Sequence, residues 1–148
     1  MDKSGADESF RMRDFYVNVS SFDSLNHFPS NAGDSFTVKF PVELHMSGAS
    51  WMCALVDISH PALVTPVRML TLYCDAVRDT IIDGKLCKIL RRFPNRRFDG
   101  VAYSSPQYIK VKSERLTQMS FMLKGDNNSS VDFEKGETYI TLHFILES

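Results

Sequence analysis

The stretch DFYVNVSSFDSLNHFPSNAGDSFTVKFPVEL, residues 14–44, decides the fold that we expect for this chain. It holds two runs in which apolar and polar residues alternate. The apolar members of the two runs are Phe15, Val17, Val19, Phe36, Val38 and Phe40. Because successive side chains of a strand point to opposite faces, each run predicts a β-strand with one buried and one solvated face. Pro41 cannot donate to a ladder, so we expect it to close the second strand or to mark where that strand leaves its sheet.

Six further segments predict the strands that cover those faces: 51–58, 70–77, 85–93, 108–111, 116–124 and 138–146. Residues 51–58 form a continuous apolar run, which is typical of a central strand buried on both faces; a short buried helix is the alternative. Residues 85–93 follow a turn at Asp83 and Gly84, and they fit both helical and strand spacing. Pro94 and the β character of the neighbouring segments favour the strand.

The count of about eight strands, spaced by turn signals, predicts an all-β, eight-stranded single jelly-roll sandwich. An immunoglobulin-like sandwich is the main alternative, but its usual Cys, Trp, Cys order is not met, because no Cys precedes Trp51. We expect a single jelly-roll domain over residues 13–148. Residues 1–12 are polar and predict a flexible N-terminal arm that orders on a neighbour. The loops at 20–34 and 59–69 are long for hairpins, as expected for jelly-roll crossovers or subunit contacts.

The composition is that of one globular domain, with 148 residues, a formal net charge of −1 and 24% charged residues. This balance gives no global reason to expect nucleic acid or an anionic membrane as a partner. Residues 1–14 are too polar for a signal peptide and no apolar run is long enough to span a bilayer, so we expect synthesis in the cytosol. Cys53, Cys74 and Cys87 are then expected to be buried, reduced thiols.

Residues with the chemistry for catalysis are scattered along the chain. None of the four histidines stands at a spacing typical of a metal site, and each is expected to have a structural or surface role. Asp57 and Asp75 are the plausible carboxylate pair for acid–base work, but the simpler expectation is that each caps a turn or pairs with Arg68 or Arg78. The sequence has no phosphate loop, nucleophile elbow or dinucleotide fingerprint. We therefore expect no enzyme, no cofactor and no metal.

Positive charge is concentrated in one segment of the chain. Six basic residues without an intervening acidic residue occupy positions 85–97: Lys85, Lys88, Arg91, Arg92, Arg96 and Arg97. One interpretation is a solvated strand end followed by a basic loop. The other is a contact surface, on which arginine side chains grip the phosphates of packaged DNA or the carboxylates of an acidic partner, such as the arm of a neighbouring subunit.

The segment FYVNVSSFDSLNHFPSNAGDSFTVKFPVELHMSGASWMCALVDISHP, residues 15–61, resembles the opening of the penton, or minor capsid, proteins of Polinton (Maverick) elements, adintoviruses and adomaviruses. Those proteins open with FYV, a Ser-rich turn, a YFP- or HFP-like triplet, and then Asn and a Phe-Thr-x-x-x-Pro strand. Later segments are also similar to that family: LTLYCDAV, KILRRFP, PQYIKV and VDFEKGETYITLHFIL. The resemblance covers roughly residues 14–146.

This resemblance implies a single jelly-roll capsid protein of a double-stranded DNA virus, which forms homopentamers at icosahedral vertices beside double-jelly-roll major capsid proteins. It implies a place in the virion, after synthesis in the host cytosol and assembly in the nucleus, and it brings no catalytic residues. Two other functions stay open. One is a free-standing jelly-roll binding module of the lectin or cytokine-like kind, and the other is a capsid cement protein that acts as a monomer or dimer.

Overall fold

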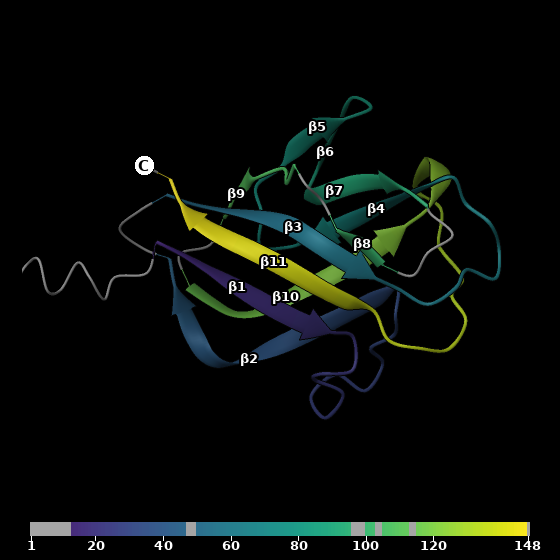
Figure 1. Ribbon diagram of the computed structural model, residues 1–148, viewed down its shortest axis with the longest axis horizontal. Coiled ribbons are helices and arrows are strands. Elements are labelled where there is room, and N and C mark those ends of the chain that lie inside the picture. The colour runs from purple at the N-terminus through teal and green to yellow at the C-terminus, as the bar shows by residue number, and fades with distance from the viewer. Residues whose placement is uncertain (1–12, 47–49, 96–99, 103–104, 113–114, 148) are drawn as a thin grey trace, which may run out of the picture.

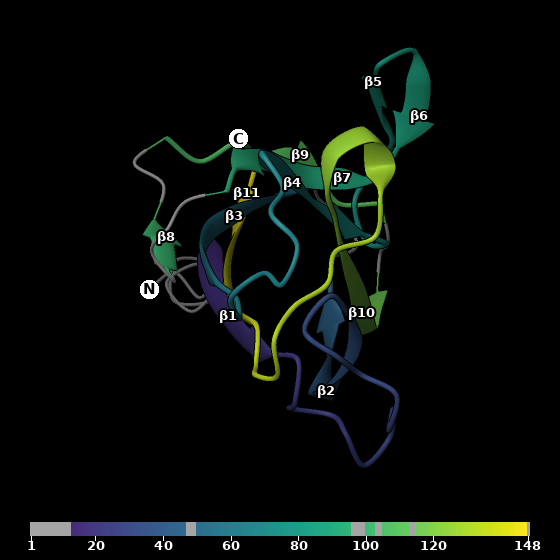
Figure 2. The same cartoon turned by 90° about the vertical axis from the view of Figure 1, so that its right-hand side faces the viewer.

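The computed structural model describes residues 13–46, 50–95, 100–102, 105–112 and 115–147. Within these residues the chain forms eleven strands, β1 to β11, one short turn of 3-10 helix, η1, and no α-helix. Two antiparallel sheets pack face to face, and a small two-stranded hairpin stands outside them (Figures 1 and 2). The prediction of an all-β sandwich is therefore confirmed. The predicted arm at residues 1–12 lies outside the described residues.

The first sheet has the strand order β1-β11-β3-β8, and a further short strand, β9, also pairs with β3. Its strands are β1 (Asp14–Ser20), β11 (Tyr139–Leu146), β3 (Trp51–Ser59), β8 (Gly100–Ala102) and β9 (Ile109–Lys110). The first and last strands of the described chain are thus direct neighbours, with Phe15 opposite Phe144.

The second sheet has the strand order β2-β10-β4-β7. Its strands are β2 (Ser35–His45), β10 (Arg115–Lys124), β4 (Met69–Cys74) and β7 (Ile89–Pro94). The chain crosses from one sheet to the other between β1 and β2, β2 and β3, β3 and β4, β7 and β8, β9 and β10, and β10 and β11. The long loops predicted at 20–34 and 59–69 make the crossings from β1 to β2 and from β3 to β4.

Large apolar side chains from both sheets fill the space between them. Those that are least exposed are Leu55, Ile58, Leu70, Leu72, Leu90, Phe93, Met119, Phe121, Leu123, Ile140, Leu142 and Phe144. Aromatic rings from neighbouring strands pack together at this core: the rings of Phe15 and Phe144 stack, with their centroids 4.9 Å apart. Burial of each such side chain stabilises the fold by about 1.5–3 kcal/mol relative to leaving it exposed.

A buried polar junction fixes the crossing between β1 and β2 against the start of β11. Thr138 is fully buried; its hydroxyl donates to the Gly33 carbonyl at 2.6 Å, and its backbone N–H donates to the Ser21 hydroxyl at 3.0 Å. The Ser21 N–H in turn donates to the Thr138 carbonyl at 2.9 Å. These bonds satisfy groups that would be costly to bury alone, so they hold the loop in one position.

Strand β3 confirms the prediction of a central strand and rules out the helix alternative. Cys53, Ala54 and Leu55 are consecutive and fully buried, which requires cover on both faces of the strand. Pro41, in contrast, does not end its strand, because β2 continues to His45. Lys39 pairs with Gln118 and Leu44 with Leu116, across a register shift. Pro41 lies in this irregular stretch, where its missing N–H costs no ladder bond.

The expected single strand at 85–93 was wrong. It is divided into β6 (Lys85–Cys87) and β7, and β6 forms a separate hairpin with the unpredicted β5 (Thr80–Ile82). The turn between them has positive φ at both central residues, 51° at Asp83 and 77° at Gly84, which matches the right-handed twist of a tight hairpin. This hairpin, together with the unpredicted β8, raises the strand count above the predicted eight, whereas β9 falls within the strand predicted at 108–111.

The cysteines differ in burial. All three have free thiols, and Cys53 and Cys74 are buried, as predicted. Burial raises the pKa of both thiols, to about 12 for Cys74. Cys87 is only partly buried because it lies on the hairpin, so the prediction of a buried thiol was wrong there.

Candidate functional site

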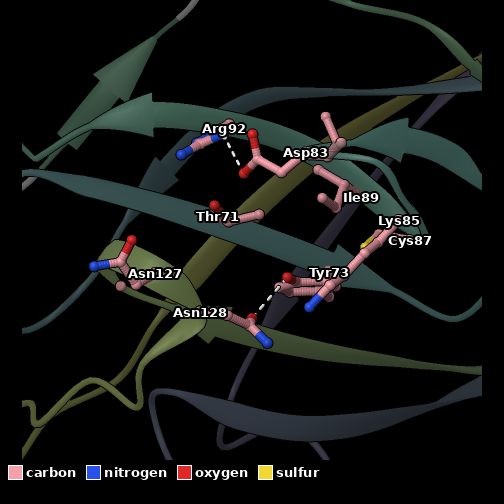
Figure 3. Close-up of a pocket in the computed structure, with 11 residues that line it drawn as sticks. Thr71, Tyr73, Asp83, Lys85, Cys87, Ile89, Arg92, Asn127 and Asn128 are labelled. Atoms are coloured by element: carbon pink, nitrogen blue, oxygen red, sulfur yellow. Dashed lines mark hydrogen bonds and ion pairs between the residues drawn. The ribbon is translucent and has the colours of Figure 1, made fainter.

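A polar hollow of about 260 Å³ lies on the outer face of the second sheet, between the β5–β6 hairpin and the turn η1 (Asp126–Asn128) (Figure 3). Its floor consists of Thr71 and Tyr73, whose side chains alternate along β4 with the buried Leu70 and Leu72. The residues that line it are Thr71, Tyr73, Ile82, Asp83, Lys85, Cys87, Ile89, Arg92, Gly125, Asn127 and Asn128.

The wall formed by η1 is fixed to the start of β4. The carboxylate of Asp126 accepts the backbone N–H of Arg68 at 2.9 Å and that of Met69 at 3.0 Å. These two hydrogen bonds lower the pKa of Asp126, because they stabilise its charged form. Asn128 has a φ of 62°, and its side-chain oxygen accepts the Tyr73 hydroxyl at 2.8 Å. In Figure 3 the Tyr73 and Asn128 side chains point toward each other across the hollow.

The opposite wall carries charge of both signs. An Arg92 nitrogen lies 3.7 Å from a carboxylate oxygen of Asp83, and the Asp83 side chain is 81% exposed, so this ion pair contributes little to stability. Burial raises the pKa of Tyr73, and the neighbouring Cys87 adds to the rise, whereas Arg92 opposes it. The hollow therefore offers a phenol, two amides, two cations and an anion to a molecule that contacts it.

The four described members of the basic cluster singled out in the sequence do not share one surface. Lys85 and Arg92 lie at the rim of the hollow, and Lys88 pairs with Asp79 at 3.0 Å. Arg91 is opposite the buried Leu72 in the ladder, on the core side of the sheet edge, and it donates to the Ser105 carbonyl at 3.0 Å. Arg96 and Arg97 lie outside the described residues.

A hydrogen-bonded network around His143 lies on the outer face of the first sheet. One ring nitrogen of His143 is 2.8 Å from the Tyr108 hydroxyl, and the other is 2.9 Å from the Asp14 carboxylate. The ring also stacks on Tyr16, with centroids 4.4 Å apart. His143 is opposite Ala54 in the ladder, and this small side chain leaves room for Tyr108 to reach it. The network ties β1, β11 and the segment before β9 together.

Sequence reasoning expected a structural or surface role for His143 but assigned it no partners, because Asp14 and Tyr108 are distant in the sequence. The two carboxylates considered for acid–base work are not brought together, since Asp57 belongs to β3 in the first sheet and Asp75 follows β4 in the second. Asp75 accepts the Ser120 N–H at 2.9 Å. Among the described residues, no group of three or more His, Cys, Asp or Glu side chains is arranged to hold a metal ion.

The most exposed aliphatic side chains described are on the hairpin. Ile81 and Leu86 are directly opposite each other in the β5–β6 ladder and are 72% and 70% exposed. Both side chains therefore form one apolar tip on the same face of the hairpin. Sequence reasoning missed this tip, although its signal was present: a two-residue Asp-Gly turn with short β-forming segments on either side.

An apolar groove of about 410 Å³ lies between β1 and β2, which are the edge strands of the two sheets. Its apolar members include Val17, Phe40, Val42 and Leu44, and Val42 is 64% exposed. Asp23 and Lys39 also line it. Because β1 and β2 belong to different sheets, the groove lies between two sheet edges rather than inside the core.

No known protein family matches the sequence, and no curated protein is similar enough to count as a relative. In the part of the chain that the structure describes, no helix is long and apolar enough to cross a membrane.

Proposed function

We propose that this chain is a structural capsid subunit, a single jelly roll that forms homopentamers at the icosahedral vertices of a double-stranded DNA virus. Strand pairing carries the proposal. With the hairpin set aside and β8 and β9 counted as one interrupted strand, eight strands are left. They pair first with last, second with seventh, third with sixth and fourth with fifth. A long antiparallel ribbon wound into two facing sheets has this pairing, which is the plan of a jelly roll.

The sequence resemblance to penton proteins supports the same function, since it extends over both sheets, from residue 14 to residue 146. The surface supports it as well. Exposed aliphatic residues occur on the hairpin and at the edge between β1 and β2, and such residues are typical of surfaces that contact other protein. In this proposal the partners are further copies of the chain and a major capsid protein.

A jelly-roll binding module is the second candidate, and the polar hollow over β4 is the observation that favours it. The hollow is open and of moderate size, and its phenol, amides and charges suit a polar ligand such as a sugar. A capsid cement protein, acting as a monomer or dimer, is the third. The three candidates differ in oligomeric state.

The mass of the purified protein in solution tests the proposal. We expect light scattering at several concentrations and two salt levels to give a species near five times 16.9 kDa. A strict monomer under all conditions would contradict a self-assembling pentamer and would direct the search to a ligand of the hollow or to a capsid that the monomer bridges. A dimer would favour the cement function.

A further inference from the structure

We propose that the apolar hairpin tip of one copy docks in the β1–β2 groove of the next copy. This contact deepens the proposed function, on which it rests, because it names the two surfaces that join subunits in the ring. The tip is formed by Ile81 and Leu86, and the groove by Val17, Phe40, Val42 and Leu44.

The exposure of two aliphatic side chains does not stabilise the hairpin within its own chain. Strands β5 and β6 pair only with each other among the described strands, and both views show the hairpin standing clear of the sandwich (Figures 1 and 2). A lone two-stranded hairpin is marginally stable in water, and an apolar tip at 72% and 70% exposure adds no stability. Contact with another protein surface gives these side chains the burial that their own chain does not.

The groove lies where a partner can reach it. Because β1 and β2 are edge strands, each has backbone N–H and C=O groups that no neighbouring strand pairs. Val42 at the groove is 64% exposed and Tyr16 is 59% exposed. The outer N–H groups of Thr37 and Lys39 on β2 are already bonded to the side chains of Asn31 and Ser24. An aliphatic pair from outside therefore meets an apolar floor between two sheet edges and docks through its side chains.

Charges on the two surfaces are complementary. The hairpin carries Asp83 and Lys85 at its turn, and the groove is lined by Lys39 and Asp23. Lys85 pairs with Ile82 and lies on the hollow side of the hairpin, so the charge next to the tip is that of Asp83, which is opposite in sign to Lys39 at the groove. Docking can place opposite charges together at the rim, which favours one orientation of the hairpin over its reverse.

The occupant is a second copy and not the same chain. Both views place the hairpin at one edge of the molecule and β1 and β2 at the opposite edge, so the tip does not reach its own groove (Figures 1 and 2). A contact between two different patches on identical subunits is heterologous, and it closes into a ring when the rotation per subunit divides a full turn. Pentamers need a contact of this kind.

The first experiment removes the apolar tip. The double variant Ile81→Ser, Leu86→Ser changes only exposed side chains, so its circular dichroism spectrum should match that of the unmodified protein. We expect the oligomer to dissociate at concentrations about 100-fold higher than before, because two aliphatic contacts per interface are lost. Val64→Ser, which alters a 58% exposed valine in the β3–β4 loop, is the matched control and should leave assembly unchanged.

The second experiment identifies the partner surface by disulfide formation. Chains with Leu86→Cys and chains with Val42→Cys, both also carrying Cys87→Ser, are mixed and oxidised. We expect a covalent dimer in the mixture and none from either chain alone. A dimer from the Leu86→Cys chain alone would show that tip meets tip, which overturns the proposal.

The outcomes separate this proposal from the proposed function. An oligomer that persists in the double variant, with no cross-link in the mixture, overturns the docking contact and leaves the pentamer standing. A cross-link together with a mass that is not pentameric supports the contact and overturns the fivefold ring. A monomer with no cross-link overturns both.

Discussion

At the scale of single residues, one carboxylate fixes the position of the loop after β10. Asp126 accepts two backbone N–H groups at the start of β4, and Asn127 and Asn128 hold positive φ values of 54° and 62° in the same turn. Asn adopts this left-handed conformation more readily than most residues. The hydrogen bonds of Asp126 therefore keep the turn, and with it one wall of the hollow, attached to the sheet.

We expect the substitution Asp126→Asn to lower the melting temperature at neutral pH, because the amide replaces a charged acceptor of two hydrogen bonds. The pKa of Asp126 is lowered in the folded protein, below the usual 3.8. Its stabilising effect is therefore complete above that value and is lost as the pH falls through the lowered pKa. Thermal melts of both proteins from pH 7 downward should converge at the acid end.

Asp132→Asn in the next loop serves as the control for the general effect of removing a negative charge. A difference between Asp126→Asn and the unmodified protein that stays constant down to the lowest pH would contradict the role assigned to the carboxylate.

Predictions for single residues were correct where the neighbouring residues in the sequence determine the structure. The alternation at Phe15, Val17 and Val19 predicted β1, and the apolar setting of Cys53 and Cys74 predicted their burial. The His143 network was not accessible in this way. Its partners Asp14 and Tyr108 are joined by the pairing of distant strands, and no local spacing in the sequence encodes that pairing.

At the scale of elements, the conformation of the β5–β6 hairpin depends on its turn rather than on packing against the two sheets. Gly84 has a φ of 77° and no atom within 4 Å of the position where a Cβ would lie. Space is thus available for a side chain, and only the backbone conformation resists one.

We expect Gly84→Ala to destabilise the hairpin by roughly 1–2 kcal/mol, the cost of a left-handed conformation for a residue with a Cβ. Because the hairpin lies outside both sheets, its opening should not unfold the sandwich. Hydrogen exchange should accelerate at residues 80–87 and stay unchanged in β3 and β11. Gly84→Asn is the matched control, since Asn tolerates positive φ, and it should exchange nearly as slowly as the unmodified hairpin.

Faster exchange across both sheets in Gly84→Ala would instead mean that the hairpin is part of the cooperative core.

Element boundaries were the weakest part of the sequence predictions. In the run 85–93, apolar residues continue across Lys88, so periodicity gave no sign that the chain leaves the hairpin there and enters β7. The Lys88 carbonyl accepts the Cys74 N–H at 3.0 Å, a bond to the second sheet that fixes the division. For Pro41, the expected end of the strand was wrong, because β2 continues to His45. The alternative, that Pro41 marks where the strand leaves regular pairing, agrees with the register shift in the β2–β10 ladder.

At the scale of the whole molecule, the two-sheet architecture was predictable because alternating apolar faces can be buried only against other sheets. The distribution of the described cations of the basic cluster was not predictable. Arg91 and Arg92 are adjacent in the sequence and therefore lie on opposite faces of β7, which separates a cluster that looks continuous in the sequence.

We expect removal of residues 1–12 to weaken the pentamer while the melting temperature of the domain stays the same. The segment is polar and carries Asp2, Asp7 and Glu8, so its stabilising contacts are expected on a neighbouring subunit. Sedimentation of the truncated protein, at the concentration where the full chain is half assembled, measures the effect. Unchanged sedimentation would show that the arm has no part in assembly.

The pairing of β1 with β11 also determines when this protein can fold. Strand β1 is made before the other described strands, and among these it has no partner in its sheet until residues 139–146, which follow all of them, have been made. Such long-range pairing slows folding to roughly milliseconds to seconds, and it leaves strand edges open while the chain is incomplete. Synthesis rate and chaperone supply, and not only final stability, therefore govern how much of this protein reaches its native state.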